Sequence, residues 1–293
     1  MSQYVTKIRT NQGDKQIDYN ALANLPTISN PNLLINGDFR NPINQRGQTS
    51  YTGHELKRYT IDRWCMGDSD YGRTVEIVAE GVKVINSNTS YPGTFQQIFE
   101  HTLPKGTYTL SVKVISKTGS GIFYCTGSHG STKGNLVVGV NTLTLTDATI
   151  NSVKIEVSPG SDFTLEWAKL EVGSVATQFS PKIYAEELEM CLRYYQTITK
   201  YRCMLGVVTS ENAYCAIPLS TTMRTSPSVS VVESDYIDLD SRSHVAPENI
   251  GKDGAYTTDK VVTLLVKKNS ASTFTAGQCL NCSVTARFDA EIY

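Results

Sequence analysis

Residues 165–196 read LEWAKLEVGSVATQFSPKIYAEELEMCLRYYQ, and they place a β pattern, a turn and a helical pattern in succession. Apolar and charged residues alternate imperfectly over 165–172, which predicts a strand that ends near Gly173. Ser180 and Pro181 follow as a helix start signal, because serine caps free backbone N–H groups and proline has the backbone angle of the first helical position. The segment therefore predicts a β module that ends where a helix begins.

The helical pattern has a single apolar face. Its apolar residues recur with the period of an α-helix, and they are Tyr184, Leu188, Cys191, Leu192 and Tyr195. Glutamates lie early in the pattern and Arg193 lies late, as the helix dipole favours. We expect residues 181–197 to form a short linker helix between two β-rich modules. A stripe of about four turns is too short to be stable alone, so its apolar face must either fold back on its own β domain or meet copies of itself about a threefold axis.

Composition and charge exclude several classes of protein. The chain has 293 residues, a net charge of -1 and 19% charged residues, so nothing indicates binding to nucleic acid or to an anionic membrane. The longest apolar runs, such as 261–266, are strand-sized and far below the roughly 20 residues of a membrane helix. The first residues lack the apolar core of a secretory signal, so we expect synthesis in a cytoplasm without export by the general route. The seven cysteines include a C-x-x-C at Cys279 and Cys282, which we interpret as buried strand thiols rather than as a zinc site.

Short alternating segments separated by Gly, Pro and Asn dominate the rest of the chain. Eight or more predicted strands lie within residues 31–180, which is typical of a β-sandwich. Further strands are predicted in 198–293, with a long polar loop over 233–258. Residues 1–30 contain few apolar residues, so we expect them to be disordered or to be ordered by pairing with another chain. The predicted fold class is all-β, with two β-sandwich modules joined by one short α-helix.

Several phrases in the first module resemble a known family. They are NLLINGDF at 32–39, NQRG at 44–47, DRW at 62–64, GTYTLSVKV at 106–114 and FTLEWAKLEVG at 163–173. They look like a jelly-roll carbohydrate-binding module. Together with EELEMCLRYY at 186–195, and with the ending DAEIY at 289–293, they resemble the distal parts of bacteriophage tail fibres and related receptor-binding proteins.

This resemblance implies a place in a virion and a set of partners. It implies a homotrimer with the helices at the axis, an upstream tail or baseplate protein attached through residues 1–30, and a bacterial surface glycan as ligand. It also implies a structural calcium ion as a possible cofactor, for which Asp38 or Glu166 are candidates. Attachment without catalysis is the expected function, with a purely structural tail component or a polysaccharide depolymerase as the alternatives.

Candidate ligand-binding residues follow from the chemistry of sugars. Aromatic faces pack on the apolar side of a pyranose ring, and nearby amides and carboxylates bind its hydroxyl groups. The candidates are Tyr71, Tyr91 and Trp64 in the first module and Tyr236, Asp238 and Asp240 in the second. Trp64 follows a strand-like run, so it is also a candidate core residue. The second group is interpreted either as a solvated loop or as a tip loop that contacts a receptor.

Catalytic motifs are not found in the sequence. The four histidines include no zinc-protease pair, and the chain contains no nucleophile elbow, no Walker loop and no dinucleotide-binding glycine motif after a strand. We therefore predict that the protein is not an enzyme.

Overall fold

A computed structural model describes most of the chain. The described residues are 7–10, 13–16, 29–53, 58–67, 72–128, 132–238, 244–245, 249–254, 256–267, 275–277 and 279–293. Tyr71 and Asp240 lie outside these residues, and for Tyr236 and Asp238 only the backbone is described. Near the amino terminus, β1 (Lys7–Thr10) and β2 (Gly13–Gln16) pair as an antiparallel hairpin.

The first lobe contains a nine-stranded sheet that folds over on itself. Its strands are β3 (Ser50–Gly53), β4 (Cys65–Met66), β5 (Arg73–Val78), β6 (Gly81–Asn86), β7 (Gly93–Thr118), β8 (Gly121–Thr126), β9 (Gly134–Asn135), β10 (Gly139–Val157) and β11 (Ser161–Val172). They are ordered β3-β5-β6-β11-β7-β10-β8-β9, and β4 also pairs with β7.

Two long strands make this sheet sandwich-like. One half of β7 pairs with β11 and with the start of β10, whereas its other half pairs with β4 and with the end of β10. Register shifts between Leu145 and Ser152 mark where β10 passes from one layer to the other. The core between the layers is formed by alternate residues of these strands, such as Leu110 and Val112 of β7 and Ile155 of β10. The predicted β-sandwich-like first module is confirmed.

The helix is shorter than predicted. It begins at Tyr184 and ends at Leu192, so α1 (Tyr184–Leu192) covers about half of the predicted 181–197. Extended Ile183, rather than Ser180, is the N-cap, and no side chain caps it. The predicted cap and first helical position are therefore wrong. At the other end, Tyr195 begins a strand that pairs with the last strand of the chain, and this tertiary pairing ends the helical pattern early.

The second lobe contains a curled antiparallel sheet of seven strands. They are β12 (Tyr195–Val207), β13 (Asn212–Pro218), β14 (Ser228–Asp238), β15 (His244–Val245), β16 (Asn249–Lys252), β17 (Val261–Lys267) and β18 (Cys279–Asp289), in the order β15-β14-β18-β12-β13-β17-β16. One face encloses a core of small and branched residues that includes Val262, Leu280 and Phe288. This arrangement confirms the predicted all-β class for both lobes.

One predicted loop is partly wrong. The polar segment 233–258 includes the end of β14 and the short strands β15 and β16. Its first part is strand because β18 is long enough to pair with β14 as far as Asp238, which lies opposite Leu280.

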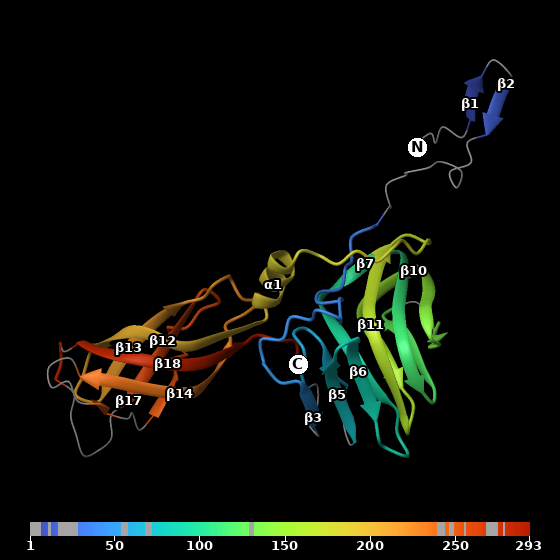
Figure 1. Cartoon of the computed structure of the whole chain (residues 1–293). Coiled ribbons are helices and arrows are strands. Elements are labelled where there is room, and N and C mark those ends of the chain that lie inside the picture. Colours follow the sequence, from blue (N-terminus) through green and yellow to red (C-terminus); the bar gives the residue numbers. More distant parts are fainter. Residues whose placement is uncertain are drawn as a thin grey trace.

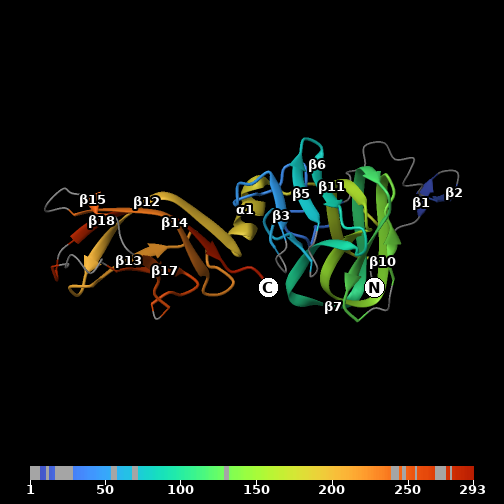
Figure 2. The same cartoon turned by 90° about the horizontal axis from the view of Figure 1, so that it is seen from below.

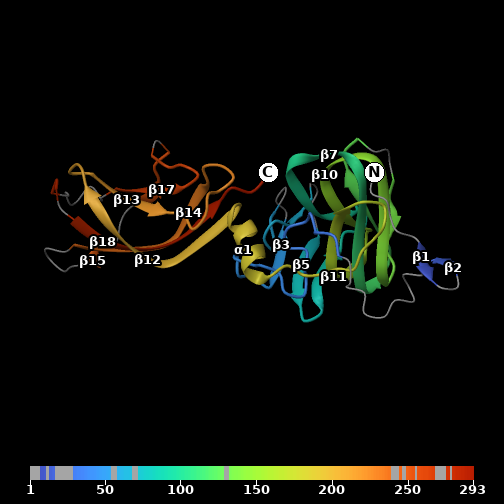
Figure 3. The same cartoon turned by 90° about the horizontal axis from the view of Figure 1, so that it is seen from above.

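The lobes lie end to end with α1 between them (Figure 1). Seen from below and from above, the carboxyl end of the chain returns to the space between the lobes (Figures 2 and 3). Within the described part of the chain, no helix is long and apolar enough to cross a membrane.

Candidate functional site

Two tight turns of the first lobe build its contact with the second lobe. In the first turn the N–H of Gly47 donates to the carbonyl of Asn44 over 3.2 Å, and Gly47 has a positive φ of 71° that favours glycine. In the second turn the N–H of Trp64 donates to the carbonyl of Ile61, and Arg63 adopts a φ of 69°. These turns, NQRG and DRW, carry Arg46 and Arg63 toward the second lobe.

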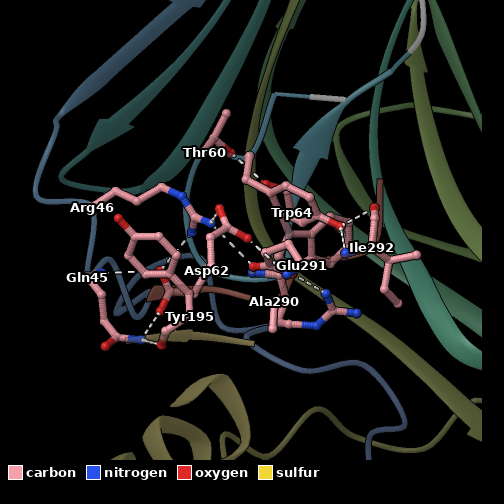
Figure 4. A network of polar contacts seen from close by, with 12 residues as sticks. Gln45, Arg46, Thr60, Asp62, Trp64, Tyr195, Ala290, Glu291 and Ile292 are labelled. Atoms are coloured by element: carbon pink, nitrogen blue, oxygen red, sulfur yellow. Dashed lines mark hydrogen bonds and ion pairs between the residues drawn. The ribbon is translucent and has the colours of Figure 1, made fainter. Parts of the chain in front are cut away.

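A buried network of charges joins the lobes (Figure 4). Glu291, with a fully buried carboxylate, pairs with Arg63 and lies 3.4 Å from Nη2 of Arg46. The same Arg46 contacts Asp62 at 3.2 Å and Asp289 at 3.8 Å. Two guanidinium groups therefore meet three carboxylates where the end of the chain crosses between the lobes. Breaking such a buried pair is costly because it leaves an uncompensated charge.

Tyrosine rings extend the network. The guanidinium carbon of Arg63 lies 3.6 Å from the ring centroid of Tyr194, and that of Arg46 lies 3.9 Å from the ring centroid of Tyr195. The carbonyl of Tyr194 accepts a hydrogen bond from the N–H of Ala290 over 2.8 Å. These contacts hold the start of β12 against the first lobe, which is a further reason why α1 ends at Leu192.

The electrostatics of the junction are unusual at Asp62. Burial raises the pKa of Asp62 to about 6, although Arg46 and the hydrogen bonds from Gln45 oppose this shift. Burial disfavours the charge of Arg46 as well, but Glu291, Asp62 and Asp289 outweigh it and raise the Arg46 pKa. The junction is therefore a coupled group of charges in which the pKa of Asp62 is raised into the mildly acidic range.

A cleft of about 410 Å³ opens above this network. It is lined by Arg46, Gln48, Tyr51, Arg58, Tyr59, Tyr195, Ser228, Ser230, Arg287, Asp289 and Tyr293. The floor is buried aromatic side chains and Arg46, whereas the mouth is formed by polar and exposed groups from both lobes. We refer to it as the junction cleft.

The alternation of side chains along β14 and β18 determines which residues of the second lobe line the junction cleft. Ser228 lies opposite Asp289, and Ser230 lies opposite Arg287, in the pairing of β14 with β18. Directly opposite residues point to the same face of a sheet, so these four side chains share the outer face. Phe288, which lies between Arg287 and Asp289 in the sequence, points into the core instead. The alternation of side chains along β14 and β18 thus places hydroxyl and charged groups on the outer face at one end of the sheet.

The lining favours binding over hydrolysis. Among the residues that line the junction cleft, Asp289 has the sole side-chain carboxylate, and glycoside hydrolysis commonly uses two facing carboxylate side chains. Asp62 and Glu291 lie beneath, fully buried and bonded to arginines. The available groups are hydrogen-bond donors, two arginines and an exposed aromatic ring, which is a set suited to holding a polyhydroxylated ligand.

A larger cavity of about 830 Å³ lies beside α1. It is lined by the start and the end of the first lobe's chain, including Asn30 and Pro181, and by Arg193 of the segment after α1. Arg193 is already bonded to Glu100 over 2.7 Å, and no aromatic side chain lines this cavity. Size alone therefore does not make it the better candidate.

The structure separates the predicted site residues. Trp64 is fully buried, packs on Phe39 and Phe95, and donates to the carbonyl of Asn36, so it is a core residue whose faces a sugar does not reach. Tyr91 is 66% exposed, in the loop after β6.

For the second group of predicted residues, only positions in the fold are described. Tyr236 and Asp238 belong to β14, where Tyr236 pairs with Cys282. Tyr71 and Asp240 lie outside the described residues, and the described lining of the junction cleft includes neither Trp64 nor Tyr91.

The carboxylates of the two calcium candidates, Asp38 and Glu166, have partners within the protein. Glu166 forms an ion pair with Arg40 at 3.0 Å, and a carboxylate oxygen of Asp38 accepts from the N–H of Arg40 over 3.2 Å. In the part of the chain that the structure describes, no group of three or more His, Cys, Asp or Glu side chains is arranged to hold a metal ion, the C-x-x-C cysteines included. Both calcium candidates therefore already have partners within the first lobe.

Sequence reasoning missed Arg46, Asp62, Arg63 and Glu291 as a connected group. They lie within three of the phrases that carry the resemblance, namely NQRG, DRW and DAEIY. Charged residues inside the phrases that suggested the resemblance are the signal that could have nominated them. Their mutual contact spans 228 positions from Arg63 to Glu291, so no local pattern reveals it.

Comparison of the chain with protein-family models, curated proteins and solved structures found no significant match.

Proposed function

We propose that this protein is a phage tail-fibre-type receptor-binding protein. In this proposal it lies at the distal tail of the virion, is a homotrimer, and is attached to an upstream tail or baseplate protein through residues 1–30. It binds a glycan on the bacterial surface without cleaving it. The proposal rests on the sequence resemblance for its setting and on the junction cleft for its binding chemistry.

The junction cleft is the observation that carries the binding role. Its mouth presents Gln48 and Arg58 from one lobe and Ser228, Ser230 and Arg287 from the other. Each carries a hydrogen-bond donor, although the Ser228 hydroxyl already donates to the carbonyl of Asp289 over 3.3 Å, and the exposed ring of Tyr293 lies beside them. Donors around one accessible aromatic ring are what a saccharide needs for its hydroxyl groups and its apolar face.

Exposed apolar side chains at the start of α1 support the trimer. Ile183 is 69% exposed and Tyr184 is 65% exposed, although both are large and adjacent. Burying them against the same residues of two other copies would remove apolar surface from water. Three copies would also present three equal clefts, so weak binding at each would become strong attachment through effective concentration.

Binding to cells and to glycans tests the proposal. The full chain, fluorescently labelled, is expected to bind cells of a susceptible bacterium, and excess unlabelled protein is expected to block phage adsorption. The double variant S228A/S230A is expected to weaken binding, because it removes two hydroxyl groups from the mouth of the junction cleft. Wild-type protein that binds neither cells nor any glycan on a broad array would remove the receptor-binding proposal.

A purely structural tail component is the second candidate, and the buried junction favours it. Arg46, Arg63, Asp62 and Glu291 fix the two lobes to each other, which suits a rigid spacer as well as an adhesin. A spacer would neither bind cells as free protein nor compete with phage adsorption, so the same experiment separates the two candidates.

A further inference from the structure

We propose that the junction cleft selects acidic glycans, those that carry a carboxylate or a phosphate group. This inference rests on the proposed function and names the class of ligand. It is carried by two arginines at the mouth of the cleft, one from each lobe, whose guanidinium groups retain donors that no described residue engages.

Arg287 is the stronger of the two. It is an exposed residue of β18, and its side chain makes no hydrogen bond or ion pair with any residue that the structure describes. Its position opposite Ser230 on the outer face places a hydroxyl group next to the guanidinium. An unpaired guanidinium beside a hydroxyl, inside a cleft, is a ready site for a carboxylate or phosphate group, because its planar fork matches both.

Arg58 faces the same cleft from the first lobe. One nitrogen, Nη1, donates to the carbonyl of Thr52 over 2.7 Å, which anchors the side chain. The remaining N–H groups of this half-buried guanidinium have no further partner among the described residues. An anchored arginine loses less conformational freedom when it binds an anion than an arginine that moves freely.

The charges within the cleft favour an anion. Arg46 is neutralised from below by Asp62 and Glu291, so it contributes little to the mouth. Asp289 is the sole lining residue with an acidic side chain, and it is engaged by the Tyr293 hydroxyl over 2.7 Å and by Arg46 at 3.8 Å. Arg58 and Arg287 therefore leave the mouth with an excess of positive charge in a chain whose net charge is -1.

An aromatic platform stands beside these arginines. Tyr293 is 66% exposed, and its ring packs edge-on against Tyr59 with the centroids 5.5 Å apart. Its hydroxyl group is fixed by Asp289, so the ring is held in place rather than swinging free. A fixed ring next to two cations favours an acidic saccharide over an inorganic anion, because the sugar ring can stack while its charged group meets the arginines.

An array that carries matched acidic and neutral glycans tests this inference. The probes are uronic-acid polymers, polyol-phosphate polymers and neutral polymers of the corresponding sugars, with full-chain protein applied as wild type, R287Q and R202Q. Arg202 is an exposed arginine of β12 in the same sheet and lies outside the cleft, so R202Q removes an equal charge as the matched control.

We expect wild-type protein and R202Q to prefer acidic over neutral glycans. R287Q should lose binding to acidic glycans by about tenfold, since a hydrogen bond to a charged group contributes about that much. Binding of wild-type protein to uronic-acid polymers alone would identify a carboxylate as the ligand group. Binding of wild-type protein to polyol phosphates alone would identify a phosphate.

Two other outcomes distinguish failure of the acidic-glycan inference from failure of the receptor-binding proposal. Equal binding to acidic and neutral glycans, unchanged in R287Q, would overturn the acidic-glycan inference and leave the receptor-binding proposal standing. Binding to no glycan on the array, together with no binding to cells, would overturn the receptor-binding proposal and this inference with it.

Discussion

Glu291 is the residue on which the contact between the lobes depends. Its carboxylate faces both Arg63 and Arg46, so E291Q leaves two buried guanidinium groups short of negative charge. We expect this variant to lose about 3–5 kcal/mol of stability, as measured by denaturant unfolding. The double variant R63M/E291L should recover part of this loss, because it removes both partners of the pair.

An exposed ion pair provides the control for Glu291. Lys105 and Asp147 lie 2.9 Å apart with side chains 62% and 77% exposed. Because water screens such a pair, D147N should change the unfolding midpoint little, and asparagine tolerates the positive φ of 56° at this position. Equal losses in E291Q and D147N would show that the buried network does not stabilise the junction.

Asp62 gives the junction a dependence on pH. Burial holds its pKa at about 6, above the value of about 4 in an unfolded chain, so the folded protein holds this proton more tightly. The resulting stability is fully present below pH 4 or so and is lost as the pH rises through about 6. The difference amounts to about 3 kcal/mol.

Unfolding free energies of wild type and D62N between pH 4 and pH 8 or so check this effect. The wild-type curve should fall relative to that of D62N as the pH rises, because asparagine does not titrate. Parallel curves would mean that Asp62 has an ordinary pKa in the folded protein.

Among the elements, the β5–β6 hairpin leaves no room for a side chain at its turn. Gly81 has a φ of 150°, and a Cβ atom added to it would lie 2.0 Å from the carbonyl oxygen of Leu165 in the neighbouring strand. We expect G81A to destabilise the protein by about 3 kcal/mol, the upper part of the range for overpacking. G160A is the matched control, since Gly160 has a φ of 66° but open space around it, and should cost only about 1 kcal/mol. Thermal melting would contradict the steric argument if both variants shifted the midpoint equally.

Elements with a regular period were predictable from the sequence, and their ends were not. Residues 108–114 alternate cleanly and form part of β7, with Leu110 and Val112 in the core. The predicted end of the helix was wrong because Tyr195 continues the apolar period of the helix but begins β12 instead. Its ring packs on Arg46, and the ring of Tyr194 packs on Arg63. The junction cleft could not be predicted from the sequence either, because its residues come together only when β18 returns to the first lobe.

At the scale of the whole molecule, attachment should depend on three copies acting together. The double variant I183S/Y184S replaces two exposed apolar residues at the start of α1, so each chain should fold normally while association weakens. Light scattering is expected to give a trimer mass for wild type and a lower mass for the variant, whereas V138S, which alters a 60% exposed valine in the first lobe, should remain trimeric. Binding of each cleft to a soluble glycan should be unchanged, yet attachment to cells should fall by about a hundredfold or more because the effective concentration is lost. A wild-type mass of one chain at micromolar concentration would contradict the trimer, and attachment would then require affinity from one cleft alone.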